Sequence, residues 1–120
     1  MLETGHTWHR CFKGAPEEAR NLRRWVGERL RHTDAQTVAH ELFVAVLGSK
    51  PVAIDATLST SGDRVRISVG GESELSPLQT HGPGAVIVRA LSTATGIRTD
   101  GCALWAEMRC HPNSQGQKAS

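Results

Sequence analysis

The sequence predicts an α+β fold with two layers, in which helices cover one face of a mostly antiparallel sheet. Two observations lead to this fold class. A short strand precedes two helical segments, and an antiparallel hairpin is followed by a third helix and two further strands. Elements in this order bury their apolar faces when the helices pack together on the sheet. The chain has 120 residues, which is enough for one domain with its own core.

The first expected elements are a strand and a helix. Residues 7–12 alternate, so that Trp8, Arg10 and Phe12 share one face of the strand and the residues between them share the other. Pro16 is favourable in the first turn of a helix, and apolar residues at helical spacing extend this helix to about residue 30.

The next elements are a second helix and a hairpin. Residues 35–47 are apolar around much of the helix, which predicts that the helix is buried, and Gly48 is expected to cap its end. Residues 52–59 and 64–69 alternate between apolar and polar side chains on either side of a Ser-Gly-Asp turn. This pattern is typical of an antiparallel hairpin.

The last third of the chain begins with a glycine-rich segment. Residues 70–84 contain four glycines and two prolines without periodicity, which predicts a long loop of the kind that is often functional. Residues 85–95 are expected to form a helix that Gly96 ends. Short strands at 97–98 and 103–110 complete the sheet.

Composition excludes several classes of protein. The formal net charge is +2, from 14 basic and 12 acidic residues, and does not indicate nucleic acid or an anionic membrane as the partner. No apolar run approaches the ~20 residues of a membrane span, and the first ten residues lack the apolar segment of a secretory signal. The three cysteines are an odd number at loose spacing, which does not suggest a disulfide scaffold. We therefore expect a cytoplasmic protein.

Five stretches of the chain together resemble a known family. They are 16–26 (PEEARNLRRWV), 40–47 (HELFVAVL), 65–69 (VRISV), 82–96 (GPGAVIVRALSTATG) and 101–108 (GCALWAEM). Their order and spacing resemble the histidine-kinase-like ATPase (GHKL) superfamily, and within it the actinobacterial anti-sigma-factor/serine-protein-kinase branch. The resemblance implies a two-layer sandwich of the Bergerat type with about three helices. It places the ATPase-like domain at 6–111. Residues 112–120 are polar and lack apolar periodicity, which predicts a disordered tail, and residues 1–5 are expected to be frayed.

The resemblance also implies a nucleotide site, which this sequence keeps only in part. In the family the second helix carries a Glu that activates the attacking group and, four residues later, an Asn that holds magnesium. Glu41 matches the Glu, but Ala45 stands at the Asn position. Magnesium requires hard oxygen ligands, which a methyl group does not provide.

Three further family contacts are altered. Gly71 stands where the family has the Asp that accepts a hydrogen bond from adenine. Gly82 and Gly84 match the glycines of the phosphate-binding turn, but Pro83 between them lacks an N–H donor and a basic side chain. Ala103 ends a Gly-Cys-Ala sequence where the family has Gly-Lys-Thr.

These losses predict a degenerate ATP site. Charge-assisted phosphate contacts contribute roughly 1.5–3 kcal/mol each, so losing several weakens nucleotide binding by orders of magnitude. We therefore expect a non-catalytic regulator that acts by binding a protein. The resemblance implies a sigma factor or a STAS-type anti-anti-sigma protein as partner, with a homodimer as a further arrangement. ATP and magnesium are disfavoured as cofactors.

Two alternative functions remain open at this point. In the first, the protein is an active serine/threonine kinase with altered contacts, in which Glu41 is the catalytic base. In the second, the pocket binds another small molecule, because Ala45, Gly71 and Ala103 are smaller than the family's residues and would leave a larger, less polar cavity. If the protein has neither function, Glu41 is a solvated carboxylate and the glycine loop is a flexible flap. Gly82 and Gly84 are then present only because the turn into the helix requires unusual backbone dihedrals.

Surface residues offer a candidate partner surface. Trp8, Arg20 and Arg24 are the residues we favour, although an arginine-rich first helix is also typical of a solvated face paired with glutamates. Trp25 and Trp105 fall at apolar periodic positions and are expected in the core.

Histidines and cysteines near both ends of the chain raise the question of a metal site. His6, His9 and Cys11 would meet Cys110 and His111 if the first and last strands were neighbours. The spacing matches no standard zinc motif, and we expect no metal.

Overall fold

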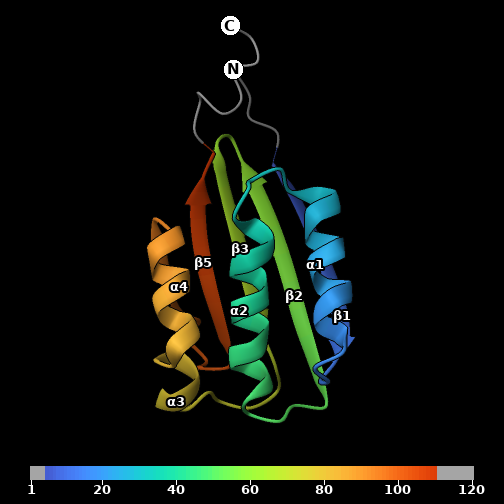
Figure 1. Cartoon of the computed structure of the whole chain (residues 1–120), viewed down its shortest axis with the longest axis vertical. Coiled ribbons are helices and arrows are strands. Elements are labelled where there is room, and N and C mark those ends of the chain that lie inside the picture. Colours follow the sequence, from blue (N-terminus) through green and yellow to red (C-terminus); the bar gives the residue numbers. More distant parts are fainter. Residues whose placement is uncertain (1–4, 111–120) are drawn as a thin grey trace, which may run out of the picture.

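The chain folds into two layers, a five-stranded sheet and a layer of helices (Figure 1). The computed structural model describes residues 5–110. The predicted disordered tail at 112–120 and His111 lie outside this part, and the predicted frayed head at 1–5 lies outside it except for residue 5. The strands are β1 (His6–Lys13), β2 (Ala53–Ser61), β3 (Arg64–Gly70), β4 (Ala94–Ile97) and β5 (Ala103–Arg109). Their order across the sheet is β1-β2-β3-β5-β4, and every neighbouring pair is antiparallel. The predicted α+β class, with two layers and a mostly antiparallel sheet, is therefore confirmed.

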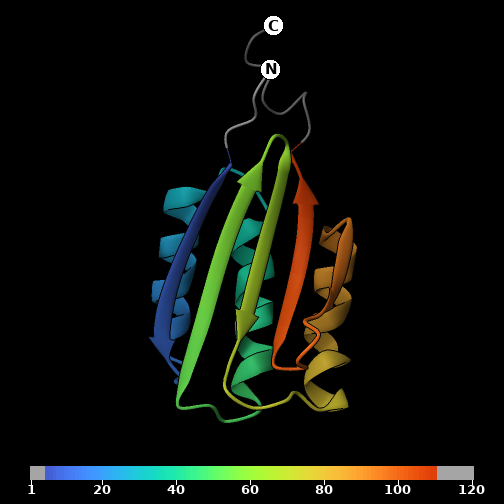
Figure 2. The same ribbon diagram turned by 180° about the vertical axis from the view of Figure 1, so that it is seen from behind.

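The helices lie together on one face of this sheet. They are α1 (Glu18–Arg29), α2 (Ala35–Leu47), the four-residue α3 (Pro77–Thr80) and α4 (Pro83–Leu91). Helix α2 lies between α1 and α4, and within residues 5–110 no helix covers the opposite face of the sheet (Figure 2).

Strand register explains which side chains form the core. Phe12 of β1 is paired with Ile54 of β2, and both are buried beneath the helices. The Phe12 ring meets Trp25 of α1 edge-on at 5.8 Å and Phe43 of α2 at 6.3 Å between ring centroids. This aromatic contact joins both helices to the sheet, since each ring buries a large apolar area.

The segment expected as a helix over 85–95 is divided between two elements. Helix α4 ends at Leu91, and the chain turns extended at Ser92, with φ −123° and ψ 152°. The amide of Thr93 then donates to the carbonyl of Glu107, 2.8 Å away. Residues Thr93 and Thr95 are β-branched and fit the pleated sheet better than a helix, so the prediction of a helix to residue 95 was wrong.

Smaller differences occur at other boundaries. Helix α1 begins at Glu18, after a turn that contains Pro16. The expected loop over 70–84 contains the short helix α3, whose start has a capping box between Ser76 and Gln79. Gly48 follows α2 as expected, but in a right-handed conformation with φ −61°.

The tryptophans have different environments. Trp25 is buried, as expected, but Trp105 is only half-buried and does not belong to the core. Strand pairing aligns Trp105 with Ser68 and Gly96 on the face of the sheet that the helices leave open. There the Arg66 guanidinium lies 4.1 Å from the ring centroid, a cation–π contact.

The order of the strands bears on the question of a metal site. Strands β2 and β3 separate β1 from β5, so the cysteine that follows β5 is not beside the histidines of β1. Among residues 5–110, no group of three or more metal-ligating side chains is placed to hold an ion. In the same part of the chain, no helix is long and apolar enough to cross a lipid bilayer.

Candidate functional site

A cavity of about 250 Å³ lies between α2 and α4 and reaches the β4–β5 edge of the sheet. Residues from five elements and the segment after α3 line it. They are Glu41, Leu42, Ala45, Gln79, Thr80, His81, Gly84, Ala85, Val88, Arg89, Thr95, Gly96, Ile97, Leu104 and Trp105. The walls are mainly apolar, as is typical of sites that bind small molecules.

Helix α2 supplies the two residues that the sequence singled out there. Glu41 and Ala45 are separated by about one helical turn, and both line the cavity. The Glu41 side chain is half-buried, and within residues 5–110 its carboxylate has no hydrogen-bond or ion-pair partner. The site therefore presents one unpaired carboxylate beside a methyl group.

The start of α4 closes the cavity on the other side. Gly82 is the N-cap residue, with φ −74° and ψ −175°, and Pro83 follows it in the first turn. In residues 5–110, a left-handed φ is found only at Lys50, Gly62 and Gly101, so unusual dihedrals are not the reason for these two glycines.

Close packing accounts for both glycines. A Cβ atom at Gly84 would lie 2.5 Å from Oε1 of Glu41, and one at Gly82 would lie 2.9 Å from the carbonyl oxygen of Leu78. Both distances are shorter than a non-bonded contact allows. Small residues at the start of α4 therefore let this helix approach α2 and α3.

A second cavity of about 190 Å³ adjoins the first. It shares Glu41, Ala45 and Gly84 with the larger cavity and adds Gly82 and the exposed Leu78. Of the predicted nucleotide-site residues, the fold thus brings together Glu41, Ala45, Gly82 and Gly84.

The other two predicted site residues lie elsewhere. The amide of Gly71 donates to the carbonyl of Cys102, 3.1 Å away, and a Cβ at Gly71 would press on Pro51 at 3.0 Å. Ala103 is fully buried next to Gly70. Neither Gly71 nor Ala103 lines the cavity, so their small size does not enlarge it.

Sequence reasoning missed the sheet edge that forms part of the wall. Thr95, Gly96 and Ile97 of β4 line the cavity together with Trp105 of β5. A Cβ at Gly96 would lie 2.6 Å from Cζ2 of Trp105, so the indole packs on the bare backbone of this glycine. The β-branched residues around Gly96 were the signal that could have identified a strand here.

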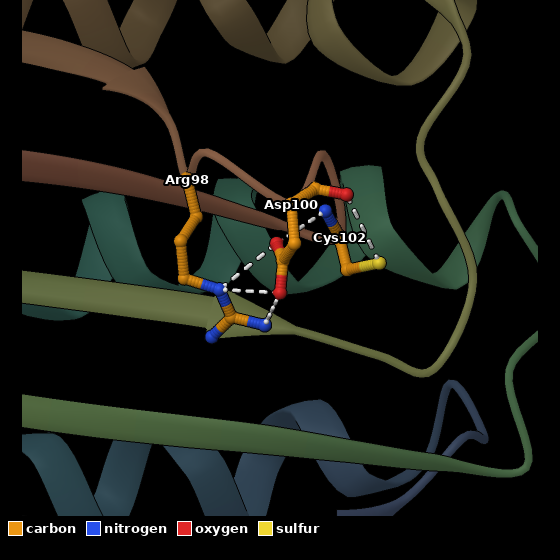
Figure 3. A network of polar contacts seen from close by, with 3 residues as sticks. All are labelled: Arg98, Asp100 and Cys102. Atoms are coloured by element: carbon orange, nitrogen blue, oxygen red, sulfur yellow. Dashed lines mark hydrogen bonds and ion pairs between the residues drawn. The ribbon is translucent and has the colours of Figure 1, made fainter.

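The turn between β4 and β5 is fixed by an exposed polar network. Figure 3 shows the Arg98 guanidinium and the Cys102 amide converging on the Asp100 carboxylate. The shortest contacts are 2.8 Å from Nη2 of Arg98 and 2.9 Å from the Cys102 amide. The hydrogen bonds from Arg98 and from the Cys102 amide lower the pKa of Asp100. This network orders the turn that joins β4 to β5.

The residues favoured as a partner surface lie at the other edge of the molecule. Arg20 and Arg24 are exposed on α1, and α2 separates this helix from α4 (Figure 1). Trp8 is half-buried, packs against the core and stacks on His6 with ring centroids 5.7 Å apart. Trp8 is thus less available to a partner than the two arginines.

Comparisons with protein-family models and with curated proteins found no match to this chain.

Proposed function

We propose that this protein is a regulator built on the histidine-kinase-like ATPase fold, and that it acts by binding another protein rather than by transferring phosphate. The observation that carries the proposal is the pair Glu41 and Ala45, which line one cavity from the same helix. The resemblance places a catalytic carboxylate and a magnesium ligand at these two positions. Only the carboxylate is present.

The chemistry of the cavity supports this proposal. Magnesium-bound triphosphate carries several negative charges and needs oxygen ligands for the metal as well as cationic or N–H donors for the phosphates. Here Ala45 supplies no ligand, Pro83 removes an amide donor, and Glu41 is itself negatively charged. A volume of about 250 Å³ is also below the range that is usual for drug-sized ligands.

Exposed apolar residues on the helix layer supply a surface for the partner. Val44 of α2, Leu78 of α3, and Val86 and Ile87 of α4 are 45%, 82%, 60% and 40% exposed. Val44 and Leu78 line the same small cavity, so they lie near one another. Apolar side chains gathered on an otherwise polar surface are typical of protein–protein contacts.

The partner that the resemblance suggests is a sigma factor or a STAS-type anti-anti-sigma protein. In our proposal the apolar residues of α3 and α4 contribute most of the affinity. Arg20 and Arg24 on α1 would attract an acidic partner and raise the association rate. A homodimer through the same apolar surface is the competing arrangement.

Binding assays with paired variants test this proposal. Candidate sigma factors and STAS proteins encoded beside this chain would be titrated against the wild type, Val86→Asp with Ile87→Asp, and Arg20→Ser with Arg24→Ser. We expect nanomolar to micromolar binding by the wild type and at least tenfold weaker binding by the aspartate variant. The serine variant should mainly slow association. Full binding by the aspartate variant would contradict the proposed surface.

The active kinase is the second candidate, because the unpaired Glu41 carboxylate lines the cavity at the start of α4. It predicts transfer of phosphate from ATP to a serine or threonine of the same STAS protein. Loss of this transfer in Glu41→Gln would establish the kinase and overturn the proposed function.

A further inference from the structure

We infer that the cavity between α2 and α4 binds a small organic cation, a primary amine or amidinium on an apolar, ring-sized body, with Glu41 as its counter-ion. This inference does not depend on the proposed protein partner, because it concerns the isolated chain. Three properties of the cavity carry it: its charge, its walls and its size.

The charge of the cavity comes from Glu41. Its carboxylate is half-buried, lines both adjoining cavities, and has no partner within residues 5–110. A buried or half-buried carboxylate without a partner loses solvation that an N–H donor can restore. No second side chain completes a metal site, since residues 5–110 hold no suitable group of three metal ligands. An organic cation is therefore the fitting counter-ion.

The other charged side chain at the cavity is Arg89. It lies five residues after Gly84 on α4, about 7.5 Å farther along the helix at 1.5 Å per residue. Arg89 is exposed, so it sits at the rim rather than against Glu41. His81, exposed after α3, also lines the cavity, and its Nδ1 is 2.9 Å from Oγ1 of Thr80. Within residues 5–110, neither side chain forms an ion pair or hydrogen bond with the Glu41 carboxylate.

The walls select an apolar body for the ligand. Leu42 and Ala45 of α2, Val88 of α4 and Leu104 of β5 face the space from several sides. Burial of apolar ligand area contributes about 25 cal/mol per Å². An amine without an apolar group would bind weakly, because a single solvent-exposed ion pair contributes little binding free energy.

The size of the cavity limits the ligand. A volume of about 250 Å³ corresponds to roughly eight water molecules at about 30 Å³ each. A single ring with a short aminoalkyl chain fits this space, whereas a nucleoside triphosphate exceeds it.

Three probes of one shape test the inference: phenethylamine, its neutral counterpart phenethyl alcohol and the anion 3-phenylpropanoate. Each is titrated to millimolar concentration into ¹⁵N-labelled protein and followed by NMR. Ala45, Gly84 and Leu104 line the cavity, whereas Trp8 and Trp25 lie on β1 and α1, so the backbone amide signals of the first three and the indole N–H signals of the two tryptophans report cavity and remote binding separately. We expect phenethylamine to shift the Ala45, Gly84 and Leu104 amide signals but not the Trp8 and Trp25 indole signals, and to bind at least tenfold more tightly than the other two probes.

Single substitutions test whether the charge of Glu41 and the space inside the cavity are needed for binding. Glu41→Gln keeps the shape of the side chain and should weaken phenethylamine binding tenfold or more, because a hydrogen bond to a charged group is lost. Glu28→Gln, an exposed carboxylate on α1, is the matched control and should bind like the wild type. Ala45→Leu fills the cavity and should abolish binding by all three probes.

Any of four results would overturn the inference. The first two are equal binding by the amine and the alcohol and unchanged binding by Glu41→Gln, since the carboxylate would then have no role. The third is the absence of any shift of the Ala45, Gly84 and Leu104 amide signals with phenethylamine in wild-type protein whose spectrum is that of a folded chain. Tighter binding by 3-phenylpropanoate would likewise assign the cavity to anions and contradict the proposal.

Discussion

Oε1 of Glu41 lies so close to the backbone of Gly84 that a Cβ atom there would be only 2.5 Å away. This approach joins α2 to the start of α4 and defines one end of the cavity. The pair therefore has two roles. Gly84 makes room for the carboxylate, and the carboxylate is the polar group that the cavity offers to a ligand.

Gly84→Ala should destabilise the protein by about 1–3 kcal/mol, because the new methyl group collides with the Glu41 side chain. Urea unfolding measures this loss. Combining Gly84→Ala with Glu41→Ala removes the colliding carboxylate and should recover much of the lost stability. Strictly additive effects of the two substitutions would show that the two residues do not interact.

Val46 and Val44 form a matched pair on α2, since the first is fully buried and the second is 45% exposed. Val46→Ala should cost about 2 kcal/mol of unfolding free energy, from lost burial and the space it leaves. Val44→Ala should cost less than about 0.5 kcal/mol. Similar losses in both variants, measured by thermal unfolding, would contradict the described orientation of α2.

Asp100 makes the stability of the β4–β5 turn dependent on pH. Its pKa is lowered in the folded protein by hydrogen bonds from Arg98 and from the Cys102 amide. The stability that the Asp100 carboxylate contributes is therefore fully present above the pKa that Asp100 has in the unfolded chain. It is lost as the pH falls through the lower pKa of Asp100 in the folded protein.

Asp100→Asn should accordingly lower the melting temperature at neutral pH, and the difference from wild type should shrink as the pH is lowered into the acid range. Melting curves at several pH values measure this. Asp63→Asn, in the turn between β2 and β3, is the control, because Asp63 and Arg109 form only a longer contact of 3.8 Å. If the difference in melting temperature between Asp100→Asn and the wild type did not vary with pH, the Asp100 carboxylate would not be the group that makes the turn's stability pH-dependent.

Ala45→Asn restores one oxygen ligand at the position that the resemblance assigns to magnesium. We expect this variant still to show no binding of magnesium-ATP at millimolar nucleotide, since Gly71, Pro83 and Ala103 remain unchanged. Isothermal titration measures this directly. Binding by Ala45→Asn would mean that one ligand alone separates this chain from an active nucleotide site.

Much of the fold could be predicted from the sequence. Helix α2 has the predicted bounds, and the hairpin of β2 and β3 differs from the prediction by one or two residues at three of its ends. These elements have strong periodicity, and local signals such as the Ser-Gly-Asp turn agree with the tertiary structure. The antiparallel two-layer arrangement followed from their order.

The sheet edge could not be predicted in the same way. The segment after Leu91 is short and rich in Ser and Thr, without an apolar periodicity that distinguishes a helix from a strand. Its extended form depends on pairing with β5, for example through the Thr93 amide and the Glu107 carbonyl, which are distant in sequence. Because Thr95 and Gly96 were assigned to a helix and its end, their place in the cavity wall was missed.

The candidate site was likewise predicted in part. Glu41, Ala45 and Gly84 meet because α2 and α4 are neighbours, which the expected element order already suggested. Gly71 and Ala103 lie outside the cavity, because β3 and β5 pair directly there and fill the space with backbone. The half-exposed position of Trp105 depends on strand register, since a shift of one residue would move its side chain to the other face of the sheet.

Thermal unfolding with and without magnesium-ATP and magnesium-ADP tests the central claim most directly. Saturating ligand at about 100 times its Kd stabilises a folded protein by ~2.7 kcal/mol, which shifts the melting temperature of a domain of this size by several degrees. A degenerate site predicts no shift at millimolar nucleotide. A clear shift that requires magnesium would contradict the account and would assign the cavity to an active nucleotide site.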